Sequence, residues 1–239
     1  MKVKKMQLAV LGDIHGNINA FNAVLEDIKN ESVNKLLITG DLVGYYYHAD
    51  QVLNVLKDLD YELVQGNHDY MLSEFYTWDV EMKDAYRKKY GTALECAAKE
   101  LLGKEQISYL ANLPHSKEFV IAGRRILLCH GSPLDRDEYL YPDVAEDVLN
   151  RFANGKFDVV IMGHTHYPMI RRCNSTLFLN PGSVGQPRNK RPGASWALLD
   201  LENFDVQIRQ VTYDIEEVVV EARQNDPEVP YLAEVLMGR

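Results

Sequence analysis

The feature that most constrains this sequence is the hexapeptide Gly12-Asp13-Ile14-His15-Gly16-Asn17. The run before it, residues 6–11, is short and mostly apolar, as in a buried strand. After it, apolar residues recur at helical spacing over residues 20–28. The hexapeptide is therefore predicted to be a strand-to-helix turn, where open α/β sheets place their chemistry. A carboxylate and an imidazole two residues apart can bind one ion, although a helix-capping Asp beside an unrelated His is an alternative interpretation.

Two further strands are predicted at residues 35–39 and 61–64, with a helix at 49–59 between them. The first leads into Gly40-Asp41 and the second into Gly66-Asn67-His68-Asp69. This alternation of strand and helix predicts an α/β fold with a mainly parallel sheet covered by helices.

Residues 70–113 differ from what precedes them, because they are rich in Tyr, Lys and Glu and lack a strand pattern. We expect helices there, most clearly at 90–102 and 105–110. The stretch is predicted to be an insertion or cap between two halves of the core. It either walls a pocket or forms a solvated helical layer.

The second half carries antiparallel signals, beginning with a hairpin over 119–129 that ends in His130. A helix at 144–152 and a strand at 159–162 follow, and the strand leads into Gly163-His164-Thr165-His166. Further short strands are predicted at 169–171, 176–179, 195–201 and 206–211. An acidic tail that ends in helix is predicted from about 213 to 239. Because no repeat or linker is visible, we expect residues 1–239 to form a single domain.

The net charge of −9 argues against a broad surface for nucleic acid or anionic membrane. A small phosphorylated substrate is still compatible, since bound metal ions invert the charge of a pocket. The three cysteines, Cys96, Cys129 and Cys173, indicate neither a disulfide framework nor a cysteine-rich zinc site. No segment resembles a membrane helix, and the basic residues 1–5 are not followed by a signal peptide. We therefore expect a cytoplasmic protein.

Five strand-like runs end in loops that carry His, Asp or Asn. In order, these residues are Asp13 and His15, then Asp41, then Asn67, His68 and Asp69, then His130, then His164 and His166. Because a sheet gathers strand ends at one edge, these side chains are predicted to converge. Five of the seven histidines lie in these loops; the other two, His48 and His115, are interpreted as a loop residue and a surface residue.

These five blocks resemble the calcineurin-like metallophosphoesterase superfamily, whose pattern runs Asp-x-His, Gly-Asp, Gly-Asn-His-Asp/Glu, His and Gly-His-x-His. All five stand in the family's order across residues 12–166. The later stretch Asn-Pro-Gly-Ser-Val-Gly-Gln-Pro-Arg, residues 180–188, is similar to the small bacterial and archaeal phosphodiesterase branch. The resemblance implies two packed, mixed β-sheets flanked by helices.

The resemblance also implies two divalent transition-metal ions. Asp13, His15 and His166 would hold the first ion, Asn67, His130 and His164 the second, and Asp41 would bridge them. Imidazole and carboxylate ligands suit Mn, Fe, Zn, Ni or Co, of which we expect Mn. Two ions roughly 3.5–4 Å apart can activate a shared water and clamp the oxygens of a phosphoryl group.

By the same resemblance, His68 is the general acid that protonates the leaving oxygen, and Asp69 orients its ring. The alternative is that His68 is only hydrogen-bonded beside the ligands. Asn17 and Arg188 are candidate substrate-binding residues, and Arg188 either forks onto a phosphate or is a solvated surface arginine. The tyrosines at 45–47 either stack a nucleobase or pack a helix on the sheet, and packing is the commoner role.

The arginine that follows the second block in protein Ser/Thr phosphatases is missing, whereas His68 stands where some small phosphodiesterases carry Cys. We expect a phosphoesterase that hydrolyses phosphodiesters or nucleotide polyphosphates by metal-activated hydroxide, and alternatively phosphomonoesters, including nucleotides. The rival is an interaction scaffold, as in the retromer subunit of this fold, whose ligand set is incomplete. The 70–113 insertion and the acidic tail are each candidates for a contact between subunits of a homo-oligomer.

Overall fold

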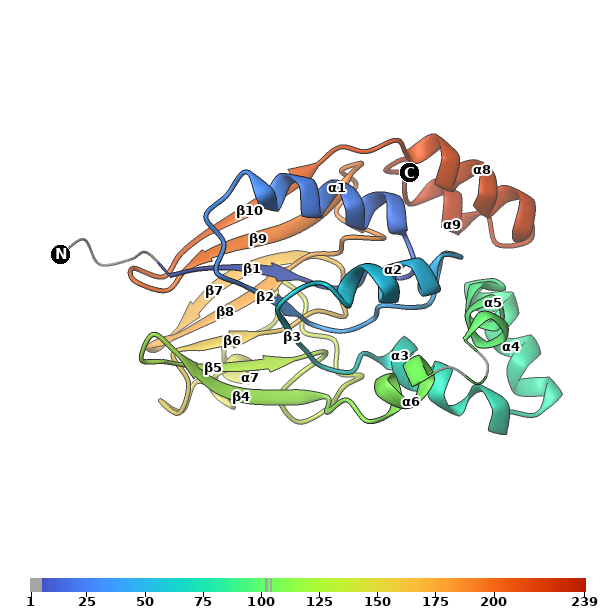
Figure 1. Ribbon diagram of the computed structural model, residues 1–239. Helices are drawn as coiled ribbons and strands as arrows, with labels where there is room; N and C mark the ends of the chain where they lie inside the picture. Colours follow the sequence, from blue (N-terminus) through green and yellow to red (C-terminus); the bar gives the residue numbers. More distant parts are fainter. Residues whose placement is uncertain (1–5, 102, 104) are drawn as a thin grey trace.

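The computed structural model describes residues 6–101, 103 and 105–239, and its centre is formed by two five-stranded sheets (Figure 1). The first sheet has the order β10-β9-β1-β2-β3 and the second β4-β5-β6-β8-β7. The first sheet comprises β1 (Gln7–Leu11), β2 (Lys35–Ile38), β3 (Tyr61–Leu63), β9 (Ala194–Asp200) and β10 (Asp205–Val211). The second comprises β4 (Ser116–Ile121), β5 (Arg124–Cys129), β6 (Val159–Ile161), β7 (Pro168–Cys173) and β8 (Thr176–Pro181). The prediction of two mixed sheets is confirmed.

Parallel strands occupy the middle of both sheets. In the first sheet β1, β2 and β3 are parallel, and β9 and β10 add antiparallel strands beside β1. In the second sheet β5, β6 and β8 are parallel, flanked by the hairpins β4–β5 and β7–β8. The antiparallel expectation for the second half is thus right for the hairpins and wrong for the middle strands. The reason is that long connections, through α7 (Glu146–Asn150) and through β7, bring the chain back in the same direction.

Each central strand is buried on both faces, and alternate residues face opposite layers. In β1, Leu8 and Val10 pack between the two sheets, whereas Ala9 and Leu11 pack in the core beneath α1 (Ile18–Lys29) and α2 (Ala49–Leu56). In β5, Leu127 lies in the cluster that also holds residues of α7. The result is four layers, helix on sheet on sheet on helix, with no described helix long and apolar enough to cross a membrane.

Residues 70–113 form a helical layer at one end of the sheets, at the right of Figure 1. It contains α3 (Asn67–Glu74), the 3-10 helix η1 (Phe75–Thr77), α4 (Val80–Tyr90), α5 (Ala93–Glu100) and α6 (Glu105–Ala111). The helix predicted at 90–102 is confirmed over Ala93–Glu100, but it begins three residues later than predicted. Gly91, at φ 84°, ends α4, and a Cβ there would stand 2.6 Å from the Asp226 carboxylate. Position 102 and the basic start, residues 1–5, lie outside the described residues.

The predicted acidic tail forms α8 (Ile215–Asn225) and α9 (Tyr231–Glu234), which lie at the same end of the molecule (Figure 1). Its inward side is apolar and packs with the tyrosines at 45–47. The buried Asp226 accepts hydrogen bonds from the Thr92 N–H (2.9 Å) and from the Tyr47 hydroxyl (2.6 Å). The tail is therefore tied to the helical layer.

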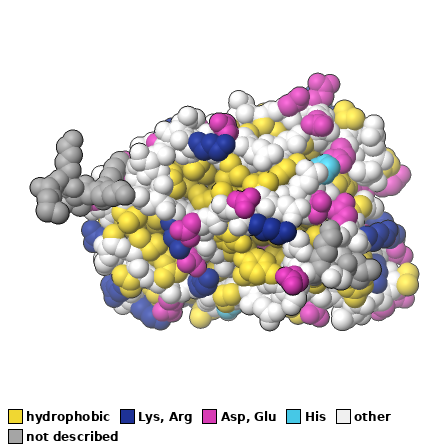
Figure 2. All heavy atoms as spheres, viewed as in Figure 1, with side chains coloured by type: hydrophobic (Ala, Val, Ile, Leu, Met, Phe, Trp, Pro, Cys, Tyr) yellow, Lys and Arg dark blue, Asp and Glu magenta, His cyan; other side chains and the backbone are white. Residues whose placement is uncertain are grey.

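The face of the molecule drawn in Figure 2 carries acidic and basic side chains scattered between apolar areas. No continuous basic area is visible among the described residues of that face. This distribution agrees with the net charge of −9 and offers no broad footprint for nucleic acid on that side.

Candidate metal centre

The loops that follow β1, β2 and β6 are held in an unusual backbone conformation. Nine described non-glycine residues have positive φ, and five of them are predicted metal ligands. These five are Asp13 (52°), His15 (52°), Asp41 (55°), His164 (66°) and His166 (62°). Positive φ costs energy for non-glycine residues and concentrates at functional sites. Here it turns side chains from several strand ends toward one point.

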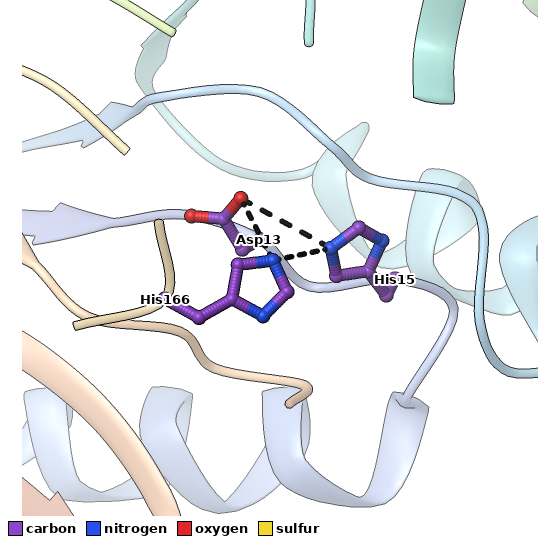
Figure 3. A group of neighbouring side chains, drawn as sticks. All are labelled: Asp13, His15 and His166. Carbon is purple, nitrogen blue, oxygen red and sulfur yellow. Dashed lines mark hydrogen bonds and ion pairs between the residues drawn. The ribbon is translucent and has the colours of Figure 1, made fainter. Parts of the chain in front are cut away.

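Asp13, His15 and His166 form one buried group (Figure 3). His15 Nδ1 lies 2.9 Å from the Val43 carbonyl oxygen, and His166 Nδ1 lies 2.7 Å from that of Gln186. Each Nδ1–H therefore donates to a carbonyl, which leaves a lone pair on each Nε2. The two Nε2 atoms are only 3.1 Å apart, and Asp13 Oδ1 is 3.4 Å from the Nε2 of His166. Three potential ligand atoms that face one another at these distances fit a bound cation.

A second group surrounds His130. Its Nδ1 lies 2.7 Å from the Thr39 carbonyl oxygen, so Nε2 is the ring nitrogen available to an ion. That Nε2 is 2.9 Å from Asn67 Oδ1 and 3.2 Å from His164 Nδ1. The mixture of imidazole nitrogen and oxygen suits a divalent transition metal.

The Asp41 carboxylate lies between the two groups. Its Oδ2 is 3.6 Å from His15 Nε2 and 3.5 Å from His130 Nε2. Its Oδ1 accepts the backbone N–H of His68 at 2.8 Å, which fixes the orientation of the carboxylate. The structure thus brings together all seven residues predicted to be ligands.

Burial dominates the electrostatics of the centre. It raises the pKa of Asp13 to about 8, and lowers the pKa of His164 to about 3 and that of His15 well below its usual range. His130 is the exception: burial lowers its pKa, but the Asp41 and Asp13 carboxylates and the hydrogen bond to Thr39 together raise it to about 9. His15 and His164 are thus neutral, as a metal site requires, whereas a bound ion would displace a proton from Asp13 and from His130.

The predicted role of Asp69 is wrong. Its carboxylate accepts the backbone N–H groups of Asp41 (2.8 Å), Leu42 (2.9 Å) and Gly66 (3.0 Å), and so shapes the loop that carries Asp41. His68 and Asp69 are consecutive in the first turn of α3, and neighbours in a helix point in different directions.

The hydroxyl of Tyr86, in α4, lies 2.8 Å from His68 Nδ1 and orients the ring instead. Burial lowers the pKa of His68 to about 4 and raises that of Tyr86 well above its usual range. No sequence pattern singled out Tyr86, because it belongs to a helix on a different part of the chain.

The substrate contact expected of Asn17 stays a prediction, and its side chain makes three hydrogen bonds within the protein. Its Oδ1 caps α1 by accepting the Ala20 N–H at 3.1 Å. Its Nδ2 donates to the Gly185 carbonyl (3.0 Å) and to the Tyr213 hydroxyl (2.9 Å). Asn17 therefore joins the first loop to the loop after β8.

A cavity of about 280 Å³ opens over the ligands Asp41, Asn67, His164 and His166. The other residues that line it are Tyr45, His68, Lys89, Tyr90, Tyr139, Arg188 and Tyr231. Arg188 lies among them rather than in solvent. Its Nη2 donates to the Tyr45 hydroxyl at 3.0 Å, and its buried Nε has no partner among the described residues. The helical layer contributes Lys89 and Tyr90, so it does wall the pocket.

Tyr46 and Tyr47 pack rather than present a stacking surface, whereas Tyr45 lines the cavity. Tyr46 and Tyr47 are buried, and their hydroxyls bind the Leu232 carbonyl and the Asp226 carboxylate. Tyr45 contacts the His15 ring edge-on, with ring centroids 4.4 Å apart. The two other histidines lie outside the centre: His48 is 3.1 Å from Glu221, and His115 is 3.4 Å from the Pro133 carbonyl.

Two face-to-face mixed sheets, with buried imidazoles and carboxylates converging at the carboxyl ends of their parallel strands, define an α/β protein with residues that could hold metal ions. The model of the calcineurin-like phosphoesterase superfamily domain matches residues 6–204, and the chain belongs to this superfamily. Residues 205–239, with β10, α8 and α9, lie beyond the matched region.

Known relatives agree with this assignment. Uncharacterized protein MJ0912 of Methanocaldococcus jannaschii is 34% identical over 228 residues, covering 88% of this chain and 89% of that protein. Phosphodiesterase YfcE of Escherichia coli K12 is 23% identical over 214 residues, covering 84% and 91%. The crystal structure of a metallophosphoesterase from Sphaerobacter thermophilus has a TM-score of 0.79 and 25% identity, covering 99% of this chain and all of that one.

Proposed function

We propose that the protein is a dinuclear metal-dependent phosphoesterase that hydrolyses phosphodiesters or nucleotide polyphosphates. The observation that carries this proposal is the 3.1 Å approach of two imidazole lone pairs, His15 Nε2 and His166 Nε2, beside a buried carboxylate. Membership of a phosphoesterase superfamily supports the reaction class.

In this proposal each ion has its own three residues, and Asp41 serves both. Asp13, His15 and His166 hold the first ion, and Asn67, His130 and His164 hold the second. When bound, two divalent ions supply Lewis-acid activation of a water and neutralise charge on the phosphoryl group. Manganese is our proposed metal, because the donors mix nitrogen and oxygen. The free thiols Cys96, Cys129 and Cys173 fit the reducing cytoplasm that we propose as the compartment.

Two side chains act on the substrate directly. The ring of His68 lines the cavity, and as an imidazolium its Nδ1–H donates to the Tyr86 hydroxyl while its Nε2–H passes to the leaving oxygen, which leaves a neutral imidazole. The Arg188 guanidinium, buried and partly unpaired beside the ligands, binds a phosphate oxygen.

A second candidate is hydrolysis of phosphomonoesters, including nucleotides. The observation in its favour is that two cations, Arg188 and Lys89, line the same small cavity. A monoester carries one more negative charge than a diester and would gain more from both.

The test is hydrolysis of bis(p-nitrophenyl) phosphate and p-nitrophenyl phosphate by protein stripped of metal and then titrated with Mn²⁺. We expect turnover of the diester to appear with Mn²⁺ and to exceed that of the monoester. Asp41→Asn removes the shared ligand and should abolish turnover, whereas Asp58→Asn, an exposed carboxylate at the end of α2, should not change it.

Preference for the monoester would select the second candidate. Folded, Mn²⁺-saturated protein that hydrolyses neither ester would contradict both and favour the interaction scaffold.

A further inference from the structure

We propose that Tyr139 and Tyr141 form a ring-binding subsite at the mouth of the cavity, which takes the planar heteroaromatic ring of a mononucleotide-sized phosphate ester. The subsite rests on the proposed function, since it names the substrate class of the same centre. We refer to these two residues as the tyrosine platform.

The platform lies directly beside the metal centre. The Tyr139 ring lines the cavity, with its centroid 4.0 Å from that of the predicted ligand His164. The Tyr141 ring is nearly parallel to it, at an interplanar angle of 14° and a centroid distance of 5.7 Å, and meets Tyr167 edge-on. A row of rings thus leads from the site of reaction to the surface.

The chain around the platform explains how two large aromatic side chains stay exposed. Leu140, between them, is only 2% exposed and packs in the core beneath the second sheet, whereas Tyr139 and Tyr141 are 49% and 42% exposed. The buried leucine anchors the loop and leaves both rings on its outer side. Within the described chain neither hydroxyl makes a hydrogen bond, so neither tyrosine joins parts of the protein through a polar contact. Exposed aromatic faces of this kind stack nucleobases.

The charged and the uncharged parts of the cavity suit different parts of the ligand. Arg188 and Lys89 line it together with the ligands, and they suit the phosphate. The platform is uncharged and suits the ring at the other end of the same molecule. The volume, about 280 Å³, lies near the lower end of the roughly 300–1,000 Å³ of small-molecule sites, which fits a mononucleotide-sized ester. A nucleic-acid polymer is disfavoured by the net charge of −9.

Adenosine 5′-monophosphate and ribose 5-phosphate provide the test, because they share sugar and phosphate and differ only in the base. Their dissociation constants are measured by calorimetry on metal-free protein, and their inhibition constants against aryl diester hydrolysis on Mn²⁺-loaded protein. We expect the nucleotide to bind at least about tenfold more tightly than ribose 5-phosphate, because base stacking on one aromatic side chain contributes this much. Tyr139→Ala should remove most of the ratio between the dissociation constants of the two ligands, and Tyr139→Phe should keep it.

Matched variants separate stacking from a structural role. Tyr139→Leu keeps bulk over His164 and should still lose the ratio. Tyr109→Ala, a comparably exposed tyrosine (41%) in α6, should retain it. If Tyr139 merely positions His164, its variants will weaken both ligands equally and lower the metal content measured by mass spectrometry.

Equal affinity of the two ligands for the wild-type protein would overturn the subsite. So would a ratio that survives in Tyr139→Ala and Tyr139→Leu. Mn²⁺-dependent turnover without a base preference would overturn the subsite alone. A base preference that depends on Tyr139, without any turnover, would support the subsite and overturn the proposed function.

Discussion

At the scale of single residues, the ring of His68 is contacted by a residue distant in the sequence rather than by the residue next to it. The adjacent Asp69 points away and holds the Asp41 loop, while Tyr86, eighteen positions further on, contacts the imidazole. In the proposed mechanism, the orientation of the proton-donating imidazole would therefore depend on the packing of α4 against the candidate metal centre.

We expect His68→Ala to keep its metal and to lose about 10²–10⁴ in kcat for esters with poor leaving groups, the usual contribution of a general acid. Esters of p-nitrophenol, which leave without protonation, should lose much less. Tyr86→Phe should reproduce this pattern more weakly. The measurement is kcat for an alkyl and a p-nitrophenyl ester, and a loss below about tenfold on the alkyl ester would exclude His68 as the acid.

Gly44 is a second residue on which the centre depends. Its φ is 134°, and a Cβ at this position would stand 2.7 Å from His15 Nδ1 and 2.8 Å from His68 Nδ1. Gly44→Ala should lower stability by about 1–3 kcal/mol through overpacking and should reduce metal binding. The control is Gly123→Ala, which has φ 76° but open space around the new methyl group. The melting temperature and the metal content of the two variants are compared. Equal losses in Gly44→Ala and Gly123→Ala would show that backbone strain alone matters.

At the scale of elements, the join between the α8–α9 tail and the helical layer matters most, because Tyr231 of α9 lines the cavity. The joining residue is Asp226, which accepts from Thr92 and Tyr47 while only 6% exposed. A residue beyond the matched superfamily region thus shapes the mouth of the metal cavity.

Asp226→Ala should destabilise the protein by about 1–3 kcal/mol or more, because buried donors lose their acceptor. KM for the substrate should rise with it as Tyr231 loses its support. Glu228→Ala, exposed in the same tail, serves as the control. Unfolding in urea and steady-state kinetics provide the two readouts, and an unchanged midpoint would show that the tail is held by its apolar contacts alone.

The sequence predicted the elements whose periodicity is strong and the loops that follow them. The strand ends at Asp13, Asp41 and His164 were predictable because apolar runs stop abruptly at His and Asp. Contacts between distant elements were not predictable in this way: Tyr86 on His68 and Asp226 on Thr92 depend on how helices pack. The break at Gly91 was missed, and the Asp226 carboxylate, which leaves no room for a Cβ at that position, lies far along the chain.

At the scale of the whole molecule, both ligand groups join the two sheets. Asp13, His15, Asp41 and Asn67 follow strands of the first sheet, whereas His130, His164 and His166 follow strands of the second. A bound ion would therefore link the two central layers as well as serve the reaction.

Removal of metal with a chelator should accordingly lower the melting temperature, and Mn²⁺ should restore it. An ion present at 100 times its Kd adds about 2.7 kcal/mol to the free energy of unfolding. Scanning fluorimetry at increasing Mn²⁺ measures the shift, with Asp41→Asn as the variant that should respond weakly. A melting temperature indifferent to both chelator and Mn²⁺ would contradict a metal site between the sheets.

The position of β1 in the first sheet also determines when that sheet can form during synthesis. β1 lies between β2 and β9, and β9 begins only at Ala194. His15 and His166, which meet in the first group, are 151 positions apart. A nascent chain that has not yet reached Ala194 therefore displays β1 with one unpaired edge. β1 must wait for a strand made nearly two hundred residues later before its sheet can close.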